Sequence, residues 1–185
     1  MTAKEFFLRY THLIFNTSQA WKHLVEVREG DQPMWRFAYP AIALSCITHF
    51  ARNCWTGGWP DGLRGGLAVF LILFCSIYLG LLCTRLYARI FLKRSMDTVT
   101  AQYFTVYCNA PVFWVSMLEP LADNFFYIGI MKVYAVYVAY IGVYTLWKQD
   151  GRPQALFSTA TGLTIALLPT LVKYIIGHIM VGLIP

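Results

Sequence analysis

The chain has 185 residues, of which 58% are hydrophobic and only 13% are charged. Soluble domains carry about 25% charged residues, so the polar side chains here are too few to cover a water-exposed globule. The length accommodates one bundle without a second domain, and the net charge of +6, placed beside apolar stretches, favours anionic lipid over nucleic acid as a partner.

Residues 1–33 precede the apolar stretches and are predicted to form amphipathic helices at the cytoplasmic membrane surface. Residues 3–15 carry aromatic and aliphatic side chains near helical spacing, which is typical of a helix lying in the headgroup region. A second helix is predicted over about 18–29, with Trp21 and Leu24 on one side. Two roles are open for these segments: packing beneath the bundle, or recruitment and membrane sensing.

Residues 34–185 hold five apolar stretches, each long enough to cross a bilayer as a helix of about 20 residues. The stretches lie at 34–52, 66–88, 101–121, 125–147 and 155–183. The predicted fold is therefore all-α, a transmembrane bundle of five helices with the N-terminal helices at its surface. Pro40 predicts a kink near the start of the first stretch, and the Gly- and Pro-rich segment 55–62 is predicted to be a loop.

The basic residues alternate between the two sides of these stretches. Eleven lysines and arginines fall in the segments on the side of the N-terminus and only two, Arg52 and Arg64, fall on the other side. Because cytoplasmic segments are enriched in Lys and Arg, the N-terminus is predicted to be cytoplasmic and the C-terminus extracytoplasmic, in the cell (inner) membrane. The cytoplasmic cations expected to contact lipid headgroups are Arg85, Arg89, Lys93 and Arg94.

Four charged residues fall in or beside the outer halves of the last three stretches: Glu119, Asp123, Lys132 and Lys173. Lys132 lies seven residues after Phe125, which places it about 10 Å into the fourth stretch. Ionised groups at such depths pair, snorkel or face the interior of the bundle. Either the lysines snorkel outward and the acids neutralise them, or the cluster lines a polar cavity that accepts an ion or a headgroup.

A tyrosine-rich face is predicted on the fourth stretch, with Tyr134, Tyr137 and Tyr144 at near-helical spacing. The third stretch offers hydrogen-bond partners across the hairpin, namely Tyr103, Tyr107 and Asn109. Interhelical packing and a polar permeation path are both compatible with this pattern. Pro111 and Pro169 each remove a helix donor, and such helix breaks can mark gates or ion sites.

Catalytic and metal-binding motifs are absent from the sequence. The four histidines are scattered, the five cysteines include no CxxC pair, and no zinc-protease, nucleophile-elbow or phosphate-loop motif occurs. The chain is therefore expected not to be an enzyme and to need no cofactor or metal.

Three segments resemble the Yip1 family of five-span membrane proteins, in its bacterial branch. Residues 13–24, LIFNTSQAWKHL, resemble a pre-membrane segment in which Phe and Ser or Thr precede an Ala-Trp pair. Residues 101–120, AQYFTVYCNAPVFWVSMLEP, and 134–146, YAVYVAYIGVYTL, resemble the family's Tyr/Ala-Pro span and its Tyr-rich successor. The resemblance implies five membrane helices and no catalytic residues. Eukaryotic relatives are associated with vesicle trafficking and small GTPases.

Two functions follow as expectations. The first is a non-enzymatic scaffold or membrane-organising protein that contacts membrane lipids and possibly its own copies, with no nucleic acid as partner. The second is a small channel or transporter for an ion or lipid that uses the outer-half polar cavity. A continuous polar cavity that reaches Lys132, Lys173 and Glu119 would favour the second.

Overall fold

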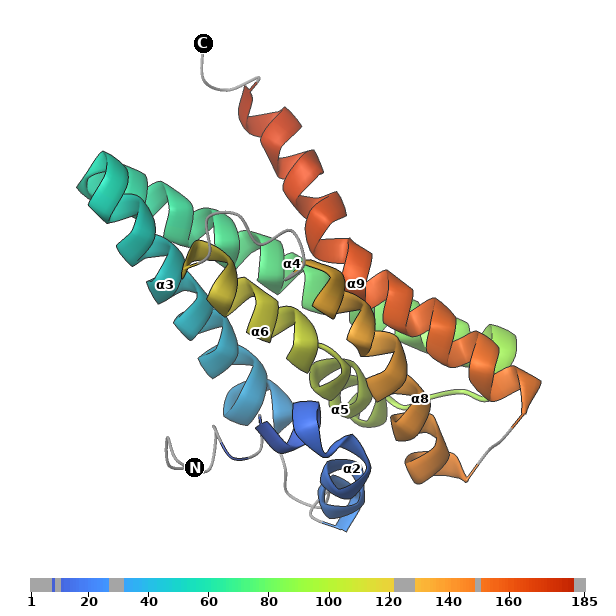
Figure 1. Ribbon diagram of the computed structural model, residues 1–185. Helices are drawn as coiled ribbons and strands as arrows, with labels where there is room; N and C mark the ends of the chain where they lie inside the picture. The colour runs from blue at the N-terminus through green and yellow to red at the C-terminus, as the bar shows by residue number, and fades with distance from the viewer. Residues whose placement is uncertain (1–7, 9–10, 27–31, 122–128, 149–150, 182–185) are drawn as a thin grey trace.

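The computed structural model describes residues 8, 11–26, 32–121, 129–148 and 151–181 (Figure 1). Within these residues every regular element is a helix and no strand occurs, so the predicted all-α class is confirmed. In chain order the elements are α2 (Thr17–Glu26), the π-helix η1 (Met34–Ala38), α3 (Tyr39–Gly57), α4 (Trp59–Phe91), α5 (Thr98–Cys108), α6 (Ala110–Leu118), and the 3-10 turns η2 (Glu119–Leu121) and η3 (Met131–Val133), followed by α8 (Tyr134–Trp147) and α9 (Arg152–Val181).

The reversal between α3 and α4 is far tighter than the sequence suggested. The prediction of a loop over 55–62 is wrong, because Gly58 alone separates the two helices. Its φ of 82° lies in a region that side chains rarely allow, so glycine lets the chain reverse in one residue. Pro60 falls in the first turn of α4, where its missing N–H has no partner to lose.

Pro40 widens the helix that precedes it, at the position where a kink was predicted. A proline has no N–H to donate to the carbonyl four residues back, here that of Arg36. The chain from Met34 to Ala38 takes π-helical geometry, and the Tyr39 N–H donates to the Met34 carbonyl five residues earlier. The extra residue in this turn re-aims α3 as it enters the bundle.

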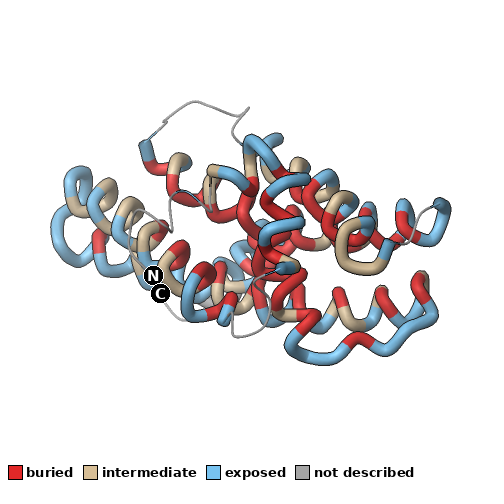
Figure 2. Tube along the Cα trace, turned by 90° about the horizontal axis from the view of Figure 1, so that it is seen from below, coloured by how far each residue is buried: buried red, intermediate tan, exposed pale blue. Residues whose placement is uncertain are grey.

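The centre of the bundle is the broken helix formed by α5 and α6. It packs against α3, α4 and α8, and almost all of its side chains are buried, which Figure 2 shows as red along the middle of the trace. A helix that is apolar on all sides belongs in the interior. The break falls at Asn109, two residues before Pro111, and the Asn109 side-chain amide donates to the Thr105 carbonyl at 2.8 Å.

The two long helices α4 and α9 turn large apolar side chains outward. Both are long and apolar enough to cross a bilayer by length and composition, and they are the two described helices for which this holds. Leu67 and Leu167 are each 62% exposed. By contrast, Thr84 on α4 is fully buried and its hydroxyl accepts from that of Thr105 on α5, at 3.0 Å. The crossing of a bilayer by all five stretches stays a prediction.

Candidate functional site

Three of the four predicted intramembrane charges line one cavity, which has a volume of about 590 Å³. Glu119 comes from η2, Lys132 from η3 and Lys173 from α9. Asp123 lies outside the described residues. The cavity lies towards the end of the bundle where α3 turns into α4, and those two helices complete its wall.

The local helix geometry directs Lys132 inward. Its neighbours Met131 and Val133 are 44% and 50% exposed, whereas the Lys132 side chain is only 16% exposed. Its Nζ lies 4.0 Å from Oε2 of Glu119, whose side chain is 53% exposed. An ion pair at this distance with one partner open to the surroundings contributes about 0–1 kcal/mol to stability. The carboxylate is therefore held loosely, while the ammonium is held within the cavity.

His49 and Arg52 of α3 also line the cavity, and the sequence-based prediction did not include them. His49 Nε2 lies 3.1 Å from the Ser116 carbonyl, and it must donate because a carbonyl only accepts. Ser116 has lost its usual helical donor, since the residue four positions later is Pro120. The His49 ring thus satisfies this carbonyl and ties α3 to α6. Arg52 is the last residue of the first apolar stretch, and this position was the sequence signal that could have placed it in the cavity.

Part of the cavity wall is apolar. α4 supplies Val69, Ile72 and Leu73 to it, and α9 supplies the buried Pro169. The cavity lining therefore combines cationic groups with aliphatic surface. Such a combination suits an amphipathic ligand better than a fully hydrated ion. Pro169 frees the Ile165 carbonyl one turn earlier, and α9 changes direction along its length in Figure 1.

Aromatic side chains fill the bundle beyond the cavity. Trp21, Tyr107 and Phe157 are fully buried. The ring centroids of Trp21 and Phe104 are 5.8 Å apart, and those of Phe104 and Phe157 are 5.5 Å apart. None of these aromatic residues is among those that line the charged cavity, so they form a packed region apart from it.

The predicted tyrosine face is divided between the core and the surface. Tyr103 donates its hydroxyl hydrogen bond to the Leu24 carbonyl of α2, and Tyr107 is buried beside Trp21. Tyr134 donates to the Ile14 carbonyl at 2.9 Å. Tyr137 and Tyr144 are 47% and 56% exposed. The N-terminal segment thus supplies the hydrogen-bond acceptors of Tyr103 and Tyr134, which were expected to come from the other helix of the hairpin.

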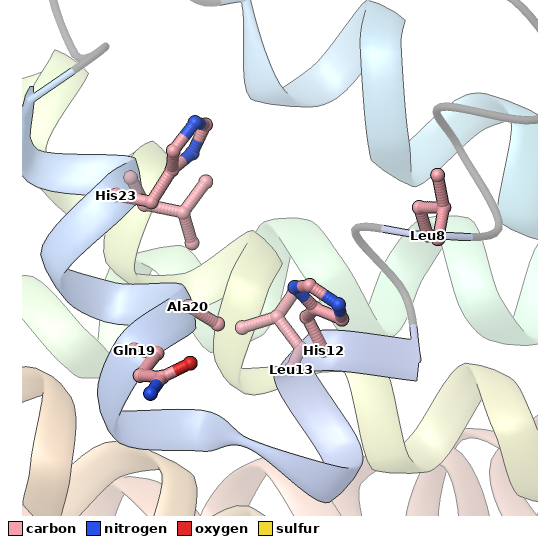
Figure 3. A pocket seen from close by; sticks show the side chains of 7 residues that line it. Leu8, His12, Leu13, Gln19, Ala20 and His23 are labelled. Carbon is pink, nitrogen blue, oxygen red and sulfur yellow. The ribbon is translucent and has the colours of Figure 1, made fainter.

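The N-terminal segment packs into the bundle. The Trp21 Nε1–H donates to the Val138 carbonyl at 3.1 Å, and the Thr17 hydroxyl lies 3.0 Å from that of Tyr134. Between the helical turn at 11–15 and α2 lies a hollow of about 480 Å³ (Figure 3). Its histidines, His12 and His23, are both exposed, so the hollow gathers no buried charged group. These contacts favour the packing role over recruitment.

The predicted headgroup cations lie together at the end of α4. Arg85 and Arg89 are one helical turn apart on α4, and Lys93 and Arg94 follow directly after it. Lys93, Arg94 and Arg89 are exposed, and Arg85 is partly buried. The described residues contain no group of three or more His, Cys, Asp or Glu side chains placed to hold a metal ion. Contact between the four cations and lipid stays a prediction.

The fold and the cavity define the class of molecule: a helical bundle with two helices of membrane-spanning length and apolarity, and a charged cavity at one end. No protein-family model, curated protein or solved structure matches this chain.

Proposed function

We propose that this chain is a five-span membrane protein of the Yip1 type that acts without catalysis, organising membrane lipid around and within its helical bundle. The observation that carries the proposal is the outward apolar surface. Leu82 and Leu86 on α4 and Leu171 on α9 are 59%, 53% and 54% exposed. Water would penalise this surface by about 25 cal/mol for each Å² of apolar area, whereas hydrocarbon does not.

The polar side chains support the same proposal because they are turned inward. Ser45, Thr105 and Gln154 are each fully buried. Ser45 bonds the carbonyl one turn earlier on its own helix, whereas Gln154 bonds the Tyr140 carbonyl across the α8–α9 contact. Hydrogen bonds between helices stabilise bundles in lipid, where hydrophobic burial between helices contributes little. The two observations together describe a molecule suited to hydrocarbon.

Lipid binding is the form of the function that the geometry favours over conduction. The cavity reaches Glu119, Lys132 and Lys173, which is the feature expected of a transporter. The buried aromatic side chains around Trp21 and Phe104 pack against one another and do not line the cavity. A cavity closed by such packing would hold a lipid headgroup, whereas conduction would need these side chains to move apart.

Reconstitution into proteoliposomes tests the proposal. The purified chain is expected to produce no ion flux and no lipid transfer between leaflets above empty vesicles, while retaining bound lipid through detergent washing. Flux that disappears in the E119Q/K173Q double variant, with folding intact, would replace organisation by transport as the function. Recovery of the chain as a well-behaved monomer without detergent would contradict the membrane proposal itself.

A further inference from the structure

We propose that two copies of this chain form a two-fold symmetric dimer in the membrane, through an aromatic strip on η1, α3 and α4 and a ring of four tyrosine hydroxyl groups. The aromatic strip consists of Trp35, Tyr39, Phe70, Phe74 and Tyr78. The dimer rests on the membrane location of the proposed function and adds a partner to it, a second copy of the chain. Three features of the strip support it: the exposure of its rings, their mutual contacts and the hydrogen-bond capacity of its two tyrosines.

The aromatic strip is a continuous row of rings on the outside of the bundle. The ring centroids of Trp35 and Tyr39 are 5.0 Å apart. On α4 the ring centroid of Phe74 lies 5.5 Å from that of Phe70 and 4.8 Å from that of Tyr78. The hydroxyl oxygens of Tyr39 and Tyr78, 3.1 Å apart, join the two helices. Trp35, Phe70 and Tyr78 are 71%, 42% and 38% exposed. None of the five residues lines the charged cavity, so the strip is a separate surface.

The two tyrosine hydroxyl groups of the strip do not use all of their hydrogen-bond capacity. Each hydroxyl has one hydrogen to donate, and its oxygen can also accept. In the Tyr39–Tyr78 pair one hydroxyl donates to the other, so the hydrogen of the accepting hydroxyl is not used. Among the described residues neither hydroxyl has a further hydrogen-bond partner. The pair therefore still offers one donor, on the accepting tyrosine, and one acceptor, on the donating tyrosine.

The depth of the hydroxyl pair makes its unused hydrogen unfavourable for a single copy. Tyr78 lies near the centre of the predicted stretch 66–88, about 15 Å of helix from the nearer end. Hydrocarbon at such a depth supplies neither water nor an acceptor group, and polar groups without a partner are costly there. A partner that brings both a donor and an acceptor to this level therefore stabilises the exposed pair. The headgroup and ester groups of phospholipids lie nearer to the membrane surface.

A second copy of the chain brings the required groups to this level. Copies inserted in the same orientation can be related by a two-fold axis along the membrane normal, which places each residue at the level of its counterpart. The unused hydrogen of each Tyr39–Tyr78 pair then donates to the free acceptor of the other pair. The four hydroxyl groups close into a ring in which each one donates once and accepts once, an arrangement in which neighbouring hydrogen bonds strengthen one another.

The rings of the strip give the two copies a surface for packing. Phe70, Phe74 and Tyr78 recur at every fourth residue, so they lie along one side of α4. Leu67 and Leu71 of the same helix are also exposed. Helices associate in lipid through van der Waals packing and hydrogen bonds between helices. Because the rings already rest against one another, they lose little conformational freedom when the copies meet.

Association of the full-length chain in phosphatidylcholine liposomes tests the dimer. Copies labelled at the N-terminus with donor or acceptor fluorophores are expected to show energy transfer that falls as the protein is diluted in lipid. Single-molecule photobleaching of copies labelled with one fluorophore is expected to give two steps before dilution. The Y39F/Y78F variant keeps the rings and lacks the hydroxyl groups, so it is expected to dissociate at a protein-to-lipid ratio at least tenfold higher than the unchanged chain.

Two further variants complete the test. Y140F/Y144F is the matched control, since Tyr140 and Tyr144 are also exposed, at 40% and 56%, but lie on α8. It likewise removes two exposed hydroxyl groups, and it is expected to dissociate at the same ratio as the unchanged chain. F70L/F74L keeps the hydroxyl groups and removes two rings, and it is expected to weaken association several-fold. Thermal unfolding in detergent checks that each variant is folded.

Several outcomes would overturn the dimer: a single photobleaching step at every protein-to-lipid ratio, more than two steps, or dissociation of folded Y39F/Y78F at the ratio of the unchanged chain. An equal loss in Y140F/Y144F, or no loss in F70L/F74L, would also contradict association through the aromatic strip. The ion-flux and detergent-dependence measurements are independent of these results. A chain that inserts into liposomes and stays monomeric would therefore contradict the dimer alone and leave the proposed function standing.

Discussion

Trp21 has the largest fully buried side chain among the described residues, and it anchors the N-terminal segment in the bundle. Its indole lies 5.8 Å from the Phe104 ring and 6.2 Å from the Tyr107 ring, between centroids. A Cβ atom on Gly142 would lie 2.6 Å from Trp21 Cζ2, so α8 has a glycine where the indole needs space. The Nε1–H bond to the Val138 carbonyl fixes the orientation of the ring. Size, shape and hydrogen bonding all specify tryptophan at this position.

Replacement of Trp21 by alanine is expected to lower the free energy of unfolding by about 3–5 kcal/mol, the range for removal of a large buried aromatic side chain. Denaturation with sodium dodecyl sulfate in mixed micelles measures this quantity. The matched control is W55A, since Trp55 is 89% exposed, and its change is expected within about 0.5 kcal/mol. Equal losses in the two variants would contradict a specific role for α2 packing.

At the scale of elements, close contact between α8 and α9 depends on Gly162. A Cβ atom at this position would overlap the backbone of Val136 on α8. Backbone atoms cannot move aside as the end of a flexible side chain does. The two helices therefore approach at this point more closely than any other residue type would permit, as small residues allow in membrane bundles.

The G162A substitution is expected to destabilise the bundle by about 1–3 kcal/mol, because the added methyl group must push α8 and α9 apart. Gly177 provides the control on the same helix: a Cβ there would meet no atom within 4 Å. G177A is expected to be neutral or slightly stabilising, since alanine favours helix over glycine by about 1 kcal/mol. Thermal unfolding in detergent compares the two, and a larger loss in G177A would refute the close-contact account.

At the scale of the whole molecule, the distribution of positive charge among the helix ends predicts one orientation in the membrane. α4 ends beside Arg89, Lys93 and Arg94, and α8 ends beside Lys148, so the same end of the bundle carries these cations. The turn at Gly58 lies at the opposite end of α4. Because cytoplasmic segments are enriched in Lys and Arg, this end of the bundle is predicted to face the cytoplasm.

Topology reporters test this orientation. A phosphatase that is active only outside the cytoplasm is expected to be active when fused after Pro185 and inactive when fused after Lys148. A fluorescent protein that matures only in the cytoplasm is expected to give the reverse pattern at the same two positions. Fluorescence from the fusion at Pro185 would invert the proposed orientation, and equal signals at both positions would remove the fifth crossing.

Sequence patterns were sufficient for the fold class and for much of the candidate site. Runs of apolar residues predict helices because the pattern is local, and the helices of the structure fall on all five predicted stretches. Depth along a helix follows from the rise per residue. Glu119, Lys132 and Lys173 have similar depths on this measure, which is why the sequence indicated one cluster. The prediction of a loop over 55–62 was wrong because Gly58 alone reverses the chain there. Composition alone cannot distinguish a reversal in one residue from a longer turn.

The remaining features depend on how the helices are rotated against one another. His49 and Arg52 line the cavity only because α3 packs against α6 and η2. Tyr134 bonds the Ile14 carbonyl because the N-terminal segment, distant in sequence by 120 residues, lies against α8. No local pattern contains this information, since it arises from packing between segments far apart along the chain.

The amino-acid sequence by itself therefore determined the helical class and the approximate course of the long helices along the chain, because hydropathy is a property of neighbouring residues. Only the tertiary structure decided which charges share a cavity, which tyrosines are buried and that Trp21 closes the bundle. Those outcomes follow from the mutual rotation of the helices, which is fixed by the fit of side chains such as Trp21 into spaces such as that left by Gly142.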